Sequence, residues 1–94
     1  MILPEARADI QSAYQWYEEQ EPGLGERFLK HLDATFELIA AFPWNYPVRL
    51  KSYRRGFVDK FPYAVYFKLH EEQIIVGYIF HNSRNPSRLP KRLG

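Results

Sequence analysis

The chain has 94 residues, of which 46% are hydrophobic and 17% aromatic, and its formal net charge is +2. This length predicts one domain, residues 1–94, with a thin core to which aromatic side chains contribute strongly. The sequence contains no cysteine, which excludes disulfides and thiolate metal sites and favours a cytoplasmic protein. No signal peptide is expected, and no apolar run reaches the roughly 20 residues that cross a membrane.

The charges are divided unequally between the two halves of the chain. Residues 1–48 carry eight acidic and three basic side chains, a net charge of −5, whereas residues 49–94 carry ten basic and three acidic ones, a net charge of +7. Such a division indicates either an anionic partner for the second half or a basic solvated face. Charge alone does not separate these two interpretations.

Two amphipathic helices are predicted in the first half. The first begins at Pro4, because proline at the first helical position costs no hydrogen bond, and it ends at Pro22-Gly23. The second extends from about Leu24 to Phe42 and ends before Pro43. The apolar face of the first helix consists of Ala6, Ile10, Ala13, Tyr14 and Tyr17, and that of the second of Leu24, Phe28, Leu29, Leu32, Phe36, Leu38, Ile39 and Phe42.

Three β-strands are predicted in the second half, at about 53–60, 63–70 and 73–81. The segment His70-Glu71-Glu72-Gln73 forms a hairpin between the last two. Both faces of the last strand are apolar, so we expect it to be central or covered on both sides. Together these elements predict an α+β fold, an N-terminal antiparallel helical hairpin packed on a C-terminal antiparallel β-sheet of three to four strands. Residues 82–94 are predicted to form a basic tail.

Candidate functional residues lie where the last strand ends and along the first. His81 could act as a general acid or base and Arg84 could bind a phosphate or carboxylate, although a strand-end histidine and a surface cation are the simpler interpretation. Alternation sends Arg54 and Arg55 to opposite faces of the sheet, and one of them could share a surface with Arg84. Further cations that could extend this surface are Lys51, Lys60, Lys68 and Arg88.

Aromatic residues and histidines add little to these candidates. Tyr53, Tyr66 and Tyr78 alternate with the cations as stacking platforms do in nucleic-acid-binding proteins, but core packing is the simpler interpretation. The three histidines lack the spacing of metal ligands, so neither a metal site nor a cofactor is expected.

The order and spacing of several short motifs resemble the RelE/ParE superfamily of toxins from bacterial type II toxin–antitoxin modules, over nearly the whole chain. The residues that carry the resemblance are Pro4-Glu5-Ala6, Asp9-Ile10, Trp16-Tyr17, Pro22-Gly23-Leu24-Gly25, Phe28, Pro43, Tyr46-Pro47, Arg54-Arg55, Phe61-Pro62-Tyr63, Val65-Tyr66, His81, Arg84 and Pro86. The resemblance implies a helical hairpin against a twisted antiparallel sheet. It also implies growth inhibition and a cognate antitoxin whose acidic segment pairs with the basic half, giving a hetero-oligomer.

The superfamily offers two mechanisms. One branch is similar to ribosome-dependent mRNA endoribonucleases, and the resemblance would give catalytic roles to His81 and Arg84, supported by Arg54 or Arg55 and Lys51 or Lys60. That branch usually carries a further tyrosine or histidine after the arginine, which the run from Asn85 to Pro90 lacks. The other branch binds DNA gyrase without a catalytic set.

The Arg54-Arg55 pair and the Phe61-Pro62-Tyr63 junction look closer to the gyrase-binding, ParE-like branch. We therefore expect a gyrase-binding toxin, with an endoribonuclease and a non-toxic basic nucleic-acid-binding domain as alternatives. In this interpretation Lys51, Arg54, Arg55, Lys60, Arg84 and Arg88 bind the target, the antitoxin or a phosphate. The superfamily normally has a full β-strand before Pro4 and often a tryptophan where Leu89 stands, and this sequence departs from both patterns.

Overall fold

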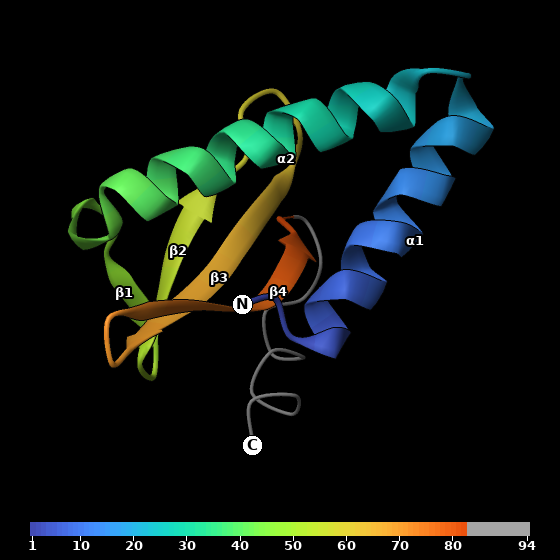
Figure 1. The fold of residues 1–94 in the computed structure, drawn as a ribbon. Coiled ribbons are helices and arrows are strands. Elements are labelled where there is room, and N and C mark those ends of the chain that lie inside the picture. The colour runs from blue at the N-terminus through green and yellow to red at the C-terminus, as the bar shows by residue number, and fades with distance from the viewer. Residues whose placement is uncertain (83–94) are drawn as a thin grey trace.

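The computed structural model describes residues 1–82, in which two helices precede a four-stranded antiparallel sheet (Figure 1). The elements are α1 (Pro4–Gln20), α2 (Leu24–Ala41), a 3₁₀ turn η1 (Pro43–Asn45), β1 (Val48–Leu50), β2 (Tyr53–Phe57), β3 (Tyr63–His70) and β4 (Gln73–His81). The strands lie in the sheet in chain order, β1-β2-β3-β4. The predicted α+β class is confirmed.

The turn between the helices is fixed by one acidic side chain. Glu18, in the last turn of α1, accepts hydrogen bonds from the backbone N–H groups of Gly23, at 3.1 Å, and Gly25, at 2.8 Å. Gly23 has a φ of 90°, a conformation in which glycine is not strained. The predicted break at Pro22-Gly23 is therefore confirmed, and the two helices diverge from this turn (Figure 1).

The end of α2 differs from the prediction. The helix stops at Ala41, and Leu38 and Phe42 are exposed although both were assigned to its apolar face. Buried Ile39 lies about 100° around the helix from Leu38, so both cannot face the sheet equally. Phe42 has left the helical conformation, with a φ of −138°, and its side chain therefore does not continue the buried face.

Two strands match the predicted bounds, and the other two do not. β3 and β4 occupy 63–70 and 73–81 as expected, and Glu71 and Glu72 form their two-residue turn with φ values of 49° and 66°. The strand predicted over 53–60 ends at Phe57, because the chain turns at Lys60, whose φ is 66°. β1 was not predicted and contributes the fourth strand.

Each face of the sheet carries its own group of buried side chains. One group joins both helices to the sheet and includes Phe28, Leu32, Ile39, Val65 and Phe67, which are nearly inaccessible to solvent. The group on the opposite face consists of Tyr53, Ala64, Tyr66, Tyr78 and Phe80. Core packing of the three tyrosines, the simpler interpretation of the sequence, is thus what the structure shows.

β4 is the last strand in the sheet rather than a central one, yet all residues from Val76 to Phe80 are buried. The N-terminal residues explain part of this. Leu3 donates its N–H to the Val76 carbonyl and Val76 donates to the Met1 carbonyl, both at 2.9 Å, so Ile2 forms a parallel bridge with β4. Asp9 of α1 supplies another contact, since its carboxylate accepts the Ile79 N–H at 3.1 Å.

A β-bulge in β4 adapts the strand to its neighbours. Tyr66 pairs with Tyr78 and Phe67 with Val76, which leaves Gly77 as the extra residue. A Cβ atom on Gly77 would lie 2.7 Å from Cε1 of Tyr53, so only glycine allows this ring to pack against the strand. Neither of the two helices among residues 1–82 is both long and apolar enough to span a bilayer.

Candidate functional site

The two arginines of β2 have different surroundings. Arg54 donates from Nη1 to the Tyr46 carbonyl at 2.6 Å, and its guanidinium lies 5.1 Å from the centre of the Trp44 ring. Tyr46, whose carbonyl binds Arg54, packs against the core between helices and sheet, so the Arg54 side chain lies on the helix-covered face. β1, which pairs with β2, forms the sheet edge beside it. The charge of Arg54 is therefore held between an aromatic ring and a backbone carbonyl.

Arg55 belongs to the opposite face of the sheet. Its guanidinium lies 4.8 Å from the centre of the Phe57 ring, and its cross-strand partner is Tyr66. The Nε atom of Arg55 is buried and has no hydrogen-bond acceptor within residues 1–82. An anion that reached this atom would meet a donor that has already lost its water, which strengthens a charged hydrogen bond.

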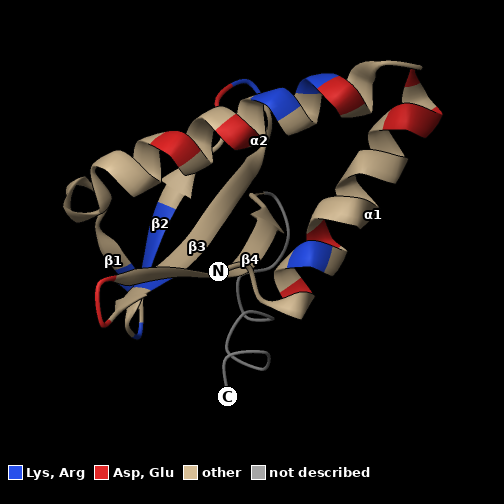
Figure 2. Cartoon of the chain, viewed as in Figure 1, with Lys and Arg blue, Asp and Glu red and all other residues tan. Residues whose placement is uncertain are grey.

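The lysines do not gather into one cluster with these arginines. Lys51 is exposed in the turn before β2 and Lys60 in the turn after it, so the two lie near opposite ends of the strand. Lys68 of β3 places its Nζ 5.4 Å from the centre of the Tyr53 ring. The basic residues from Arg49 to Lys68 thus follow β2 and its neighbours as a band, which Figure 2 shows beside helices that carry both acidic and basic residues. Arg84 and Arg88 lie outside the described residues.

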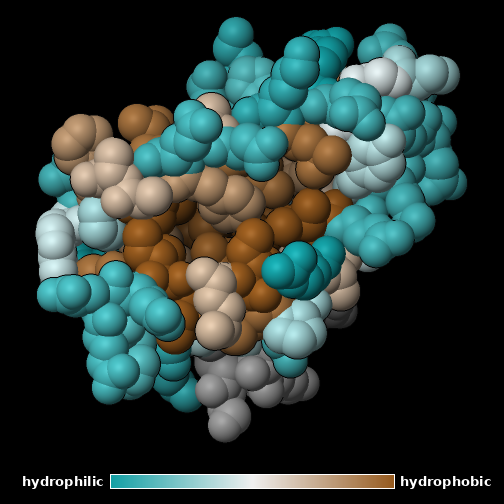
Figure 3. All heavy atoms as spheres, viewed as in Figure 1, coloured by the Kyte–Doolittle hydropathy of each residue, from teal (hydrophilic) through white to brown (hydrophobic). Residues whose placement is uncertain are grey.

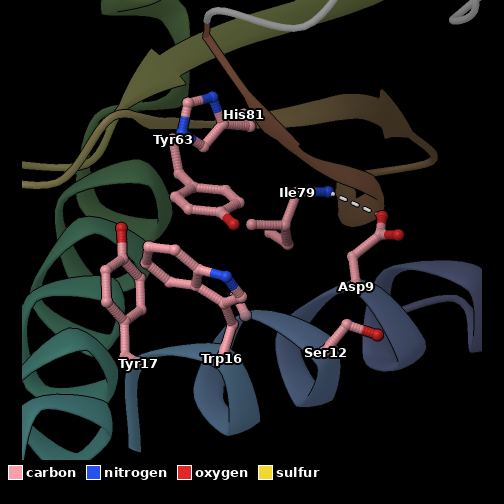
Figure 4. A pocket seen from close by; sticks show the side chains of 8 residues that line it. Asp9, Ser12, Trp16, Tyr17, Tyr63, Ile79 and His81 are labelled. Atoms are coloured by element: carbon pink, nitrogen blue, oxygen red, sulfur yellow. Dashed lines mark hydrogen bonds between the residues drawn. The ribbon is translucent and has the colours of Figure 1, made fainter. Parts of the chain in front are cut away.

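His81 lies in a different place, at a hollow between α1 and the ends of β3 and β4 (Figure 4). The hollow has a volume of about 500 Å³. Its lining residues are Asp9, Ser12, Ala13, Trp16, Tyr17, Tyr63, Ile79 and His81. The His81 ring stands edge-on to Tyr63, its partner in the strand pairing, with 5.0 Å between ring centres.

The part of the hollow that residues 1–82 line contains Asp9, Tyr17, Tyr63 and His81 but no lysine or arginine. Burial raises the pKa of Tyr17, and nearby Tyr63 raises it further, so its hydroxyl stays protonated at neutral pH. Among residues 1–82, no lysine or arginine lines the hollow. Phosphodiester cleavage needs cations against the charge that develops on the phosphorus oxygens. The lining within residues 1–82 does not supply them.

The strand register separates His81 from Arg54. His81 pairs with Tyr63, whereas Arg54 pairs with Phe67, four residues further along β3. At about 3.3 Å per residue, the two lie roughly 13 Å apart along the sheet, in addition to the spacing between strands. The strand register therefore keeps two of the candidate endoribonuclease residues, His81 and Arg54, apart. The structure also shows no cluster of three metal-ligating side chains within residues 1–82.

Sequence reasoning missed two features of this surface. Asp9 was noted only as part of a motif, and its bond to β4 depends on a contact between residues 70 positions apart. Trp44 was not among the candidate residues, and its contact with Arg54 depends on how the 3₁₀ turn meets β2. An exposed tryptophan within a proline-bounded turn was the available signal, but tryptophan at such a position is not specific for a binding site.

Comparisons with known proteins identify the class to which this fold and site belong, the RelE/ParE superfamily of toxins. The sequence profile of the ParE toxin of the type II toxin–antitoxin system parDE matches residues 1–86. The chain belongs to this ParE toxin family.

The fold is also similar to that of a solved structure, a chromosomal ParDE TA system from P. aeruginosa. That match has a TM-score of 0.76 at 14% sequence identity and covers 85% of this chain and 90% of the other. At this identity the likeness concerns the fold alone. No curated protein matches the sequence significantly.

Proposed function

We propose that this protein inhibits bacterial growth by binding DNA gyrase and that a cognate antitoxin neutralises it. The match of residues 1–86 to the ParE toxin family carries the proposal. The geometry of the described residues supports binding rather than cleavage, because His81 lies in a hollow without lysine or arginine and roughly 13 Å along the sheet from Arg54. No step of covalent chemistry is required of the protein in this proposal.

The basic band around β2 is the surface that we assign to an acidic partner. Lys51 and Lys60 are exposed cations at the two ends of this band and are accessible to carboxylates of a partner. An acidic segment of the antitoxin complements these charges and would associate faster at low salt. We propose that toxin and antitoxin form a hetero-oligomer through this band.

A supercoiling assay with purified gyrase tests the target, run beside translating ribosomes that carry a labelled message. We expect the protein to block supercoiling, to leave the message intact, and to lose its effect when its antitoxin is added. Cleaved message with normal supercoiling would establish the endoribonuclease alternative instead. Induced expression that leaves growth unaffected would favour the non-toxic nucleic-acid-binding alternative.

A further inference from the structure

Large apolar side chains are exposed at the C-terminal end of α2. Leu38 is 54% exposed, Phe42 56%, Trp44 73% and Val48 48%. Only Met1, Trp16 and Phe57 are comparably exposed elsewhere in residues 1–82, and they are far apart in the sequence. Figure 3 shows apolar side chains gathered at this end of α2 as well as beneath the helix. Exposed apolar surface of this kind marks interaction sites.

The four side chains lie at the end of α2 and on the segment that follows it, and we call them the α2-end patch. Leu38 and Phe42 are four positions apart, which places them near each other along the end of α2. Trp44 contacts the Arg54 guanidinium, and Arg54 is in turn the strand partner of Val48. The patch thus continues from the end of α2 across η1 to the sheet edge at β1.

The backbone turn that carries Trp44 is fixed by local contacts. The turn begins at Pro43 and is closed by a hydrogen bond from the Asn45 N–H to the Phe42 carbonyl at 3.1 Å. Below the ring, Arg54 is itself fixed by its bond to the Tyr46 carbonyl. An aromatic side chain that is already ordered loses little entropy on binding, and tryptophan and arginine are the residues that most often dominate binding energy at interfaces.

The chemistry of the patch specifies a protein partner. Leu38, Phe42 and Val48 have no group that could donate a hydrogen bond to a phosphate. The patch has only two aromatic rings, those of Phe42 and Trp44, which is few for a series of stacked bases. Arg49 is exposed beside the patch, on β1. The complementary surface is therefore an apolar pocket bordered by carboxylates.

A folded partner fits this patch better than a segment that folds on binding. Trp44 projects from a rigid turn and suits a preformed pocket, whereas an extended or helical segment is held in a groove. A groove of that kind exists elsewhere, in a hollow of about 480 Å³ lined mainly by Ile2, Ile10, Tyr14 and Leu29. The patch and this hollow share no residue.

We infer that the α2-end patch, with Trp44 as its anchor, binds the folded protein through which this toxin arrests growth, and that the antitoxin binds without it. This inference rests on the proposed function. Growth of a bacterial host is measured over a range of inducer concentrations for the wild type, Trp44→Ala and Trp16→Ala, each alone and with its antitoxin. Trp16 is an exposed tryptophan on α1 and provides the matched control.

We expect Trp44→Ala to need at least about tenfold more toxin for half-maximal arrest, which is the effect of losing a major interface anchor. Trp16→Ala should act like the wild type, and all three should co-purify with the antitoxin. Arg49→Glu should also weaken arrest, whereas Lys30→Glu on α2 should not. Phe42→Ser is a second variant of the patch and should also weaken arrest. Thermal unfolding of each purified variant verifies that the fold is kept.

The outcomes separate the inference from the proposed function. A wild type that does not arrest growth overturns the proposed function. Arrest by the wild type and equally by Trp44→Ala and Phe42→Ser overturns the inference alone. Loss of antitoxin binding in Trp44→Ala with arrest unchanged also overturns it, because the patch would then belong to the antitoxin.

Discussion

Asp9 shows how one side chain can position a helix against a sheet edge. Its carboxylate accepts the N–H of Ile79, whose side chain is 2% exposed. A buried backbone N–H must find an acceptor, and at the edge of a sheet no further strand supplies one. Asp9 therefore joins the middle of α1 to the end of β4 beside the hollow that contains His81 (Figure 4).

Replacing Asp9 by alanine should destabilise the protein. The Ile79 N–H would lose its acceptor in a buried position, which costs about 1–3 kcal/mol of the free energy of unfolding. Asp9→Asn should cost less, because the amide oxygen can still accept the bond. Urea denaturation measures both, with Asp33→Ala, an exposed position on α2, expected to change stability by less than about 0.5 kcal/mol. Equal stability of Asp9→Ala and the wild type would contradict this role.

At the scale of the elements, the start of α2 depends on a side chain from α1. The first N–H groups of a helix lack intrahelical partners, and Gly23 cannot cap them with a side chain of its own. Glu18 accepts from Gly23 and Gly25 and places its negative charge at the positive end of the helix dipole. The same bonds fix the angle at which the two helices diverge.

Glu18→Ala should therefore destabilise the hairpin, by about 1–2 kcal/mol, the usual range for loss of an N-terminal cap. The neighbouring Glu19→Ala is the matched control, since Glu19 is exposed on the same helix turn and should change stability by less than about 0.5 kcal/mol. Thermal unfolding followed by circular dichroism measures both. Similar melting temperatures for the two variants would show that Glu18 does not act as a cap.

The elements were predictable where local patterns decide them. Alternating apolar residues and a two-residue turn predicted β3 and β4 with the bounds that the structure shows. β1 was missed because Val48–Leu50 is too short for a pattern and gains its strand conformation from pairing with β2. β4 lies at the sheet edge with Val76–Phe80 buried, which matches the second of the two predicted alternatives, a strand covered on both sides; burial of both faces could not separate this from a central strand.

The site was less predictable than the fold because it depends on how the strands are aligned with one another. His81, Arg54 and Arg55 were each identified as candidates, but their separation follows from the register of β2 on β3 and of β3 on β4. The register of β3 on β4 depends on the bulge at Gly77, where the Tyr53 ring from β2 leaves no room for a side chain. Contacts between strands of this kind are not encoded in the spacing of residues along one segment.

At the scale of the whole molecule, the division of charge along the sequence becomes a division in space. Figure 2 shows both acidic and basic residues on the two helices, whereas the residues coloured on β1 and β2 are basic. Only weak ion pairs join charges within residues 1–82, such as Arg27 with Glu21 at 3.9 Å on the surface. The basic band is therefore not neutralised by the acidic helices, and its field remains available to an anionic partner.

The packing of α1 on the sheet predicts how the whole protein responds to alkaline pH. Tyr17 is 8% exposed and lies among Phe28, Phe61 and Tyr63. Burial raises its pKa above the ordinary value of about 10, and Tyr63 adds to the shift. In the unfolded chain the same hydroxyl ionises at that ordinary value, so the unfolded state loses its proton first as the pH rises.

The protonated Tyr17 hydroxyl therefore makes its full contribution to the free energy of unfolding below about pH 10. This contribution is lost as the pH rises through the raised pKa of the folded state. Tyr17→Phe keeps the ring in the core and removes the ionisable group. Urea denaturation at about pH 8 and about pH 10.5 should show a smaller loss of stability for Tyr17→Phe than for the wild type. Between about pH 7 and about pH 8.5, where the hydroxyl stays protonated in both states, the stability difference between the two proteins should remain constant. An equal alkaline loss in both proteins would mean that ionisation of Tyr17 does not limit the stability of the fold.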